Sequence, residues 1–250
     1  MWSLAGGEVS VTVGESVERG ICEEGVSLVD SGAGKSINLD LLISYKPDLV
    51  ICSADVAAQV SVAEVLREAG IPCAQFRVES FLDYLSVLSV MTDITGNKDA
   101  YRVYGTEQKE RIDDLLSEIS PENKKTMLFV RAGTTAKATK AKRSEDHFAA
   151  KMLEELGVYN IADSAKVLLD GLSIEDILRE DPDYIFITTM GNEELSRNYM
   201  DSLLDDSVWQ SLDAVKNGNY YYLPKDLFQF KPNGKWYEAY YALWEILYEK

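Results

Sequence analysis

Apolar residues follow two alternating patterns along the first part of the chain. Short β-branched or apolar runs predict strands at Val9–Val13, Leu49–Cys52 and Cys73–Phe76. Between the last two runs, apolar residues recur every three or four positions from Val60 to Ala69, which predicts a helix. Strands that alternate with helices predict a mostly parallel sheet with right-handed crossovers.

The pattern changes at Ser80, where apolar residues cover nearly all sides of one predicted helix. This helix ends near Gly96 and is expected to be largely buried. A second helix follows, with apolar residues at three-four spacing as far as Ile119. The predicted organisation is an N-terminal lobe at 1–96, a connecting helix at 97–119 and a C-terminal lobe at 120–250.

The second half of the chain repeats the alternation of strands and helices. Strands are predicted at Thr126–Arg131, Tyr184–Thr189 and Asn219–Leu223. Helices are predicted to begin at the N-caps Ser144 and Ser173, and an aromatic-rich helix over Trp236–Tyr248 comes last. The predicted fold class is therefore α/β with mostly parallel sheets.

Composition excludes several classes of function. The 250 residues carry 25 Lys and Arg against 42 Asp and Glu, a net charge of −17, so nucleic acid and anionic lipid surfaces would be repelled. No apolar run approaches the roughly 20 residues that span a bilayer. The three cysteines, Cys22, Cys52 and Cys73, lack metal-ligand spacing and are interpreted as core residues, with a Cys52–Cys73 bridge left open.

Signals of catalysis are poor. The chain has no Walker loop, dinucleotide fingerprint, nucleophile elbow or HExxH motif, and the stretch Gly32–Ser36 is interpreted as a turn before the cap Asn38. His147 is the single histidine of the chain and is interpreted as structural or solvent-facing. We therefore expect no enzyme, no resident cofactor and no metal centre.

Cations gather after the predicted strand Thr126–Arg131. Five basic side chains against Glu145 and Asp146 give a local charge of +3; they are Arg131, Lys137, Lys140, Lys142 and Arg143. Ligands of open α/β sheets bind beyond the carboxyl ends of the strands, so this loop is a candidate site for an anionic ligand. The alternative is a solvated basic loop. Its glycine, threonines and alanines predict mobility without a ligand.

Other strand-end loops supply further candidates. Arg77 and Lys231 are expected to add cations, and Phe228 and Phe230 to supply apolar walls, although core packing is the commoner role of such aromatic residues. Trp2 and Met190 complete the predicted ligand-binding set.

Several segments have an order and spacing that can be compared with known families. In the first half these segments are NLDLLISYKPDLVI at 38–51 and EVLREAGIP at 64–72. In the second half they are MLEELG at 152–157, NIA at 160–162, LSIE at 172–175, DPDYIF at 181–186 and WQSLDAVKNG at 209–218. Together they resemble the substrate-binding proteins of ABC importers for iron-siderophores, haem and cobalamin, and the resemblance extends over nearly the whole chain.

The resemblance implies two α/β lobes joined by one long helix, with the ligand cleft between the lobes. It also implies acidic residues that dock to a permease: Glu175 stands at the expected position in the C-terminal lobe, and Asp55 or Glu64 would substitute in the other. Members of the family begin with an export or lipoprotein signal and a first strand, both absent before Met1. The N-terminal sheet is therefore expected to lack a strand.

The function expected from the resemblance is capture of an iron complex, a ferric siderophore above all, outside the cytoplasm. Delivery to an ABC permease follows without chemistry. Cobalamin and haem are alternatives within the family, and His147 or Met190 are possible axial ligands for haem. A cytosolic α/β enzyme is the alternative outside it. The identity of the iron complex, the oligomeric state and the type of cell envelope stay open.

Overall fold

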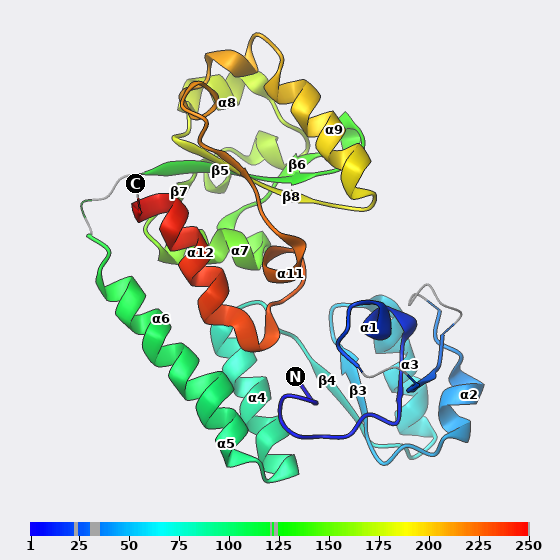
Figure 1. Cartoon of the computed structure of the whole chain (residues 1–250). Coiled ribbons are helices and arrows are strands. Elements are labelled where there is room, and N and C mark those ends of the chain that lie inside the picture. The colour runs from blue at the N-terminus through cyan, green and yellow to red at the C-terminus, as the bar shows by residue number, and fades with distance from the viewer. Residues whose placement is uncertain (23–24, 31–35, 121, 123–124, 250) are drawn as a thin grey trace. The chain divides into compact units, whose positions relative to one another are not determined.

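The computed structural model covers residues 1–250 and describes all of them except 23–24, 31–35, 121, 123–124 and 250 (Figure 1). The chain divides into two compact units, Met1–Gly105 and Thr106–Lys250. Most of the stretch Gly32–Ser36, interpreted above as a turn, lies outside the described residues. Asn38 caps a helix as predicted, because its side chain accepts a hydrogen bond from the Leu41 amide.

The first unit contains two small parallel sheets. Strand β1 (Val11–Thr12) pairs with β2 (Ser27–Leu28), and β3 (Val50–Ser53) pairs with β4 (Cys73–Phe76). The helices between these strands are α1 (Gly14–Glu18), α2 (Leu39–Ser44) and α3 (Ala57–Glu68). The predicted strands at Leu49–Cys52 and Cys73–Phe76 agree with β3 and β4, whereas the strand predicted at Val9–Val13 is reduced to two residues.

No strand among the described residues joins these two sheets. Residues of β1 and of β3 both line a cavity of about 530 Å³, whose walls are mainly aliphatic. All three cysteines are free; the Cys52 and Cys73 sulfurs lie 3.8 Å apart, and burial raises the pKa of the Cys52 thiol to about 12.

Helix α4 (Phe81–Thr95) has the predicted bounds. Ser80 and Asp83 form a capping box at its start, and Gly96, with φ of +74°, ends it. The expectation of a largely buried helix is wrong for one face, because Leu82 is 66% exposed and Ile94 is 58% exposed.

The predicted helix over residues 97–119 is not a regular α-helix. It consists of α5 (Lys98–Tyr101), a π-helical turn (Arg102–Thr106) and α6 (Glu107–Ser117). The boundary between the two compact units falls in the π-helical turn.

The second unit is built on a sheet with the order β6–β5–β8–β9, and β7 adds to the same edge of β5 as β6. The strands are β5 (Thr126–Ala132), β6 (Lys140–Ala141), β7 (Tyr159–Asn160), β8 (Tyr184–Thr189) and β9 (Tyr220–Tyr222). All of these pairings are parallel except β5 with β6. The predicted fold class, α/β with mostly parallel strands, is confirmed.

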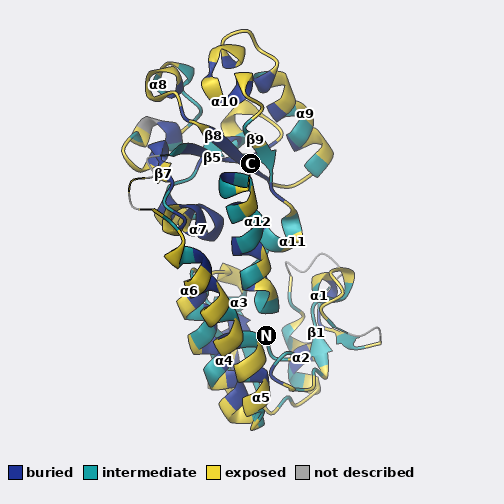
Figure 2. Cartoon of the chain, turned by 60° about the vertical axis from the view of Figure 1, so that its left-hand side comes forward, coloured by how far each residue is buried: buried dark blue, intermediate teal, exposed yellow. Residues whose placement is uncertain are grey.

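Helices cover this sheet and bury its central strands (Figure 2). They are α7 (Phe148–Glu155), α8 (Ile174–Glu180), α9 (Glu193–Leu204), α10 (Asp213–Lys216), α11 (Lys225–Phe228) and α12 (Trp236–Tyr248). Every residue of β8 is buried, as expected for a central parallel strand. Helix α12 also packs on α6, where Arg111 lies 3.6 Å from the centre of the Tyr237 ring.

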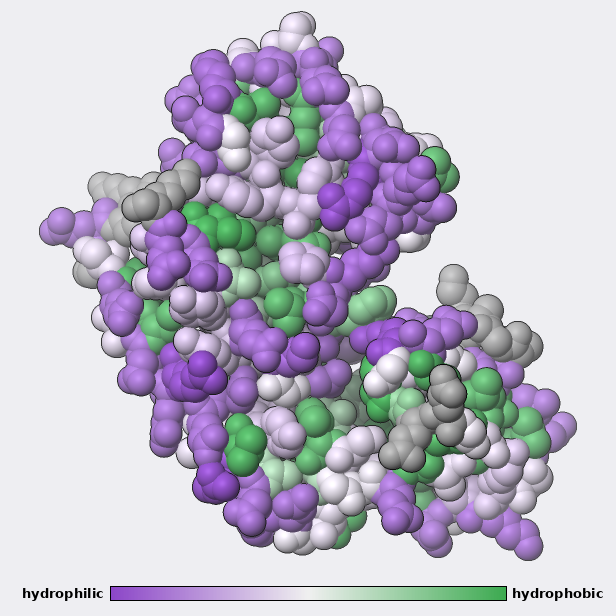
Figure 3. Space-filling model, viewed as in Figure 1, coloured by the Kyte–Doolittle hydropathy of each residue, from purple (hydrophilic) through white to green (hydrophobic). Residues whose placement is uncertain are grey.

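The surface reflects the acidic composition. Hydrophilic residues cover much of the face drawn in Figure 3, in keeping with the net charge of −17. Within the described part of the chain, no helix has the length and hydrophobicity required to cross a membrane.

Candidate anion-binding site

The candidate site begins where β5 ends. Arg131 is the last residue but one of β5, and the antiparallel register places it directly opposite Lys140 of β6. Two like charges at directly opposed positions destabilise a strand pair. This arrangement therefore favours a bound anion between or beside the two side chains.

The loop between these strands is a compact hairpin. The Gly133 amide donates to Thr139 Oγ1 at 3.0 Å, and the Thr139 hydroxyl donates back to the Gly133 carbonyl at 3.1 Å. A Cβ at position 133 would lie 2.5 Å from the Ala138 Cβ, so only glycine fits. Lys137 lies on the exposed 3₁₀ turn of this hairpin, Ala136–Ala138.

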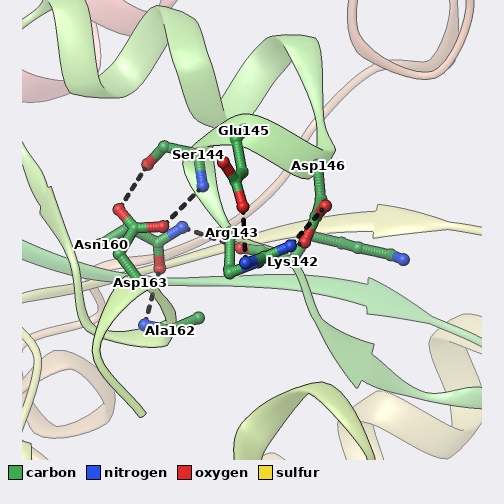
Figure 4. Close-up of polar contacts among 8 residues, drawn as sticks. All are labelled: Lys142, Arg143, Ser144, Glu145, Asp146, Asn160, Ala162 and Asp163. Atoms are coloured by element: carbon green, nitrogen blue, oxygen red, sulfur yellow. Dashed lines mark hydrogen bonds and ion pairs between the residues drawn. The ribbon is translucent and has the colours of Figure 1, made fainter. Parts of the chain in front are cut away.

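A polar anchor fixes the segment after β6 (Figure 4). The Asp163 carboxylate accepts hydrogen bonds from the Ser144 amide and the Ser144 hydroxyl, both at 2.8 Å. Asn160 Nδ2 donates to the Lys142 carbonyl at 2.8 Å, and Asn160 Oδ1 accepts from the Ala162 amide at 3.1 Å. The main chain is therefore fixed at the Lys142 carbonyl and again at Ser144, two residues later.

The cations of the loop differ in their partners. Arg143 is neutralised by Asp146, at 2.7 and 3.1 Å, and by Glu145, at 2.5 Å. Its hydrogen bond holds the pKa of Asp146 below the usual value. Among the described residues, no carboxylate lies within ion-pair distance of Arg131, Lys140 or Lys142.

Burial and mutual repulsion act on the unpaired cations. Partial burial, and after it the charge of Arg131, lowers the pKa of the Lys142 ammonium. Arg131 Nε is fully buried and has no hydrogen-bond partner in the described structure. A buried donor without a partner costs about 1–3 kcal/mol, and an anionic ligand that accepts from it would recover this energy.

His147 adjoins this cluster and caps α7, a role that the sequence analysis assigned to Ser144. Its Nδ1 accepts a hydrogen bond from the Ala149 amide at 3.2 Å. The ring packs against Phe129, with centroids 4.7 Å apart, and against Phe148, at 5.1 Å. Burial, with the charges of Lys231, Arg131 and Lys142 next, lowers its pKa to about 3.

The remaining predicted ligand residues of the second unit have different surroundings. Lys231 is half-buried, with its Nζ 5.6 Å from the centre of the Phe148 ring. Phe228 is 1% exposed and belongs to the core, whereas Phe230 is half-buried. Met190, directly after β8, is 38% exposed.

The predicted residues of the first unit do not gather in one place. Arg77 forms an ion pair with Asp55 at 2.7 Å, so these two candidates neutralise each other. Trp2 packs on Gly7, and its indole N–H donates to the Glu8 carbonyl at 2.9 Å. Glu64 is exposed on α3.

Sequence reasoning missed His147 as a member of the cluster, and it missed Asp163 and Asn160 as anchors. Asp163 lies 19 residues from Ser144, and no local pattern connects the two. Among the described residues, no three His, Cys, Asp or Glu side chains cluster in a way that would hold a metal ion. The site therefore offers mainly cationic hydrogen-bond donors.

The fold agrees with the family whose model the sequence matches. Residues 2–227 match the periplasmic binding protein family, and the chain belongs to it. A crystal structure of an ABC transporter substrate-binding protein from Listeria monocytogenes EGD-e has the same fold, with a TM-score of 0.76, 16% identity, and coverage of 99% of this chain and 94% of that chain.

Two relatives come from Bacillus subtilis (strain 168). The lipoprotein YhfQ is 22% identical over 211 residues, which is 80% of this chain. The Fe(3+)-citrate-binding protein YfmC is 24% identical over 198 residues, which is 78% of this chain. The matched regions span 63% and 59% of the lengths of these two relatives.

Proposed function

We propose that this chain is the substrate-binding component of an ABC importer and captures an anionic ferric chelate outside the cytoplasm. The observation that carries the proposal is the unpaired cationic cluster of Arg131, Lys140 and Lys142 on a protein of net charge −17. A chelate built from carboxylates or catecholates presents several anionic oxygens, which a guanidinium binds in a bidentate manner. The similarity to a Fe(3+)-citrate-binding protein supports this ligand class.

Haem and cobalamin fit the cluster less well. Haem requires an axial ligand, and the hydrogen bond that His147 Nδ1 accepts from the Ala149 amide leaves the ring proton on Nε2, so neither ring nitrogen is free to coordinate iron. Met190 lies directly after β8 and is 38% exposed. Cobalamin offers a single phosphodiester anion, which matches three unpaired cations less well than a chelate with several anionic oxygens.

Delivery to a membrane permease is part of the same proposal. Glu175 lies at the second position of α8, is exposed, and has no ion-pair partner among the described residues. It is therefore available to a permease arginine. In the first unit Glu64 is similarly exposed, whereas Asp55 is occupied by Arg77. We propose Glu175 and Glu64 as the docking acids.

Ligand titration of Arg131→Ala tests the function. Native mass spectrometry and absorbance spectra would compare ferric citrate, a ferric tris-catecholate, a ferric tris-hydroxamate, haem and cobalamin. Loss of charge-assisted hydrogen bonds worth about 1.5–3 kcal/mol weakens an anionic chelate by roughly 10- to 100-fold. Arg143→Ala is the matched control, because this arginine is already neutralised by Glu145 and Asp146.

Three results would contradict the proposal. The first is tight binding of haem or cobalamin with no binding of any ferric chelate. The second is equal weakening by Arg131→Ala and Arg143→Ala, which would assign the effect to folding of the loop. The third is catalytic turnover of a bound compound.

A further inference from the structure

One end of the His147 ring is fixed by the backbone. His147 has an extended backbone conformation, with φ of −153° and ψ of 124°, and its Nδ1 accepts the Ala149 amide hydrogen at 3.2 Å. A ring nitrogen that accepts a hydrogen bond carries no proton. The proton of the neutral imidazole therefore resides on Nε2.

The other end of the ring is open. Among the described residues His147 makes no hydrogen bond besides the one at Nδ1, and Nε2 is not among the fully buried atoms that lack a partner. Phe129 from β5 and Phe148 from α7 contact the ring and restrict its rotation. The Nε2–H group is thus a preorganised donor, accessible and unused.

The surroundings of this donor are cationic. The charges of Lys231, Arg131 and Lys142 all act on the imidazole. Arg131 Nε is a second donor without a partner, in this case fully buried. The imidazole N–H is neutral, so burying it against a ligand costs less desolvation energy than burying a charged donor, while the neighbouring cations attract the anionic oxygen.

We propose that His147 is a specificity-determining residue whose Nε2–H donates a hydrogen bond to an anionic oxygen of the ligand. The inference rests on the proposed function, since it assigns one contact to the anionic chelate. It also defines what the site rejects: an Nε2 atom that carries a proton has no free lone pair for a metal. His147 therefore selects oxygen-coated chelates and does not coordinate iron.

Methylation of one ring nitrogen separates these roles. Nε2-methylhistidine at position 147 retains the Nδ1 acceptor and removes the Nε2–H donor. It is expected to weaken ferric citrate or a ferric tris-catecholate by about 10- to 100-fold, at an unchanged melting temperature. His147→Asn is the second variant, because asparagine keeps the cap on Ala149 with a shorter side chain.

A spectroscopic signature accompanies the binding data. In ¹⁵N spectra the free protein should show a protonated Nε2 and an unprotonated Nδ1. Binding of the diamagnetic Ga³⁺ citrate complex should shift the Nε2–H resonance, and Nε2 should keep its proton. Loss of that proton on binding, or a haem Soret shift that depends on Nε2, would overturn the inference. So would equal chelate affinity of the wild type and the methylated protein. Failure of every ferric chelate to bind the wild type would instead overturn the proposed function together with this contact.

Discussion

The lowered pKa of His147 predicts a specific dependence of stability on pH. In the native state the imidazole binds a proton only near pH 3, whereas in the unfolded chain it binds one near pH 6.5. Above about pH 7.5 neither state is protonated, and His147 contributes no pH dependence. As the pH falls below 6.5 the unfolded state gains a proton that the native state does not, so the free energy of unfolding decreases.

The size of the effect follows from the two pKa values. Each pH unit within the window costs about 1.4 kcal/mol, so the loss relative to pH 8 is about 2 kcal/mol at pH 5 and about 3 kcal/mol at pH 4. His147→Asn removes the titrating group and keeps the N-cap. It also removes ring contacts with Phe129 and Phe148 worth about 1 kcal/mol. The two stability curves should therefore cross, with the wild type more stable at pH 8 and the variant more stable at pH 5.

Urea unfolding from pH 8 to pH 5 measures this difference. Three of the four tryptophans lie in the second unit, so fluorescence reports mainly on the unit that contains His147; they are Trp209, Trp236 and Trp244. Because the chain has one histidine, the other titrating groups are the same in both proteins and cancel in the comparison. Parallel curves over this range would refute the argument, since they would show that His147 keeps an ordinary pKa in the native state.

Two further predictions concern the anchor and the docking acid. Asp163→Ala removes the carboxylate that accepts from the Ser144 amide and hydroxyl, and it should lower the free energy of unfolding by about 2–4 kcal/mol and weaken the binding of anionic chelates. The control is Asp170→Ala, at an exposed position, which should change neither quantity. Denaturant unfolding and ligand titration measure both effects, and equal effects of the two substitutions would contradict the prediction. Glu175→Gln should lower the free energy of unfolding by at most about 1 kcal/mol and leave chelate affinity unchanged, while ligand uptake through the reconstituted transporter decreases. Uptake at the wild-type level would show that Glu175 only stabilises the start of α8.

The parts of the fold that were predictable are those where a local pattern decides the structure. The α4 bounds follow from Ser80 and Gly96, because a capping box and a left-handed glycine act within one turn of the helix. Strand β8 is a continuous apolar run next to Asp181-Pro182, and its bounds were predicted without error. The two-residue β1 was overpredicted, because a β-branched run indicates strand propensity and does not show how many residues find a partner.

At the start of α7 the structure differs from what the local sequence signals predict. Ser144 has the sequence of an N-cap, with acidic residues after it, and the prediction placed the start of the helix there. In the structure Ser144 lies in a 3₁₀ turn, Ser144–Asp146, where its amide and hydroxyl donate to Asp163, and His147 takes the cap role three residues later. A side chain that is 19 positions away cannot be weighed from a local pattern.

The same displacement explains why the donor cluster was only half predicted. Arg131, Lys140 and Lys142 could be proposed as a group because charge is visible in the sequence and the three residues lie close together in it. Which cations stay unpaired depends on geometry: Arg143 turns to Glu145 and Asp146, while the strand register opposes Arg131 and Lys140. His147 enters the cluster because α7 begins at its position. If α7 began at Ser144, the imidazole would lie in the first turn of that helix, without its bond to the Ala149 amide and with Nδ1 free to carry the proton.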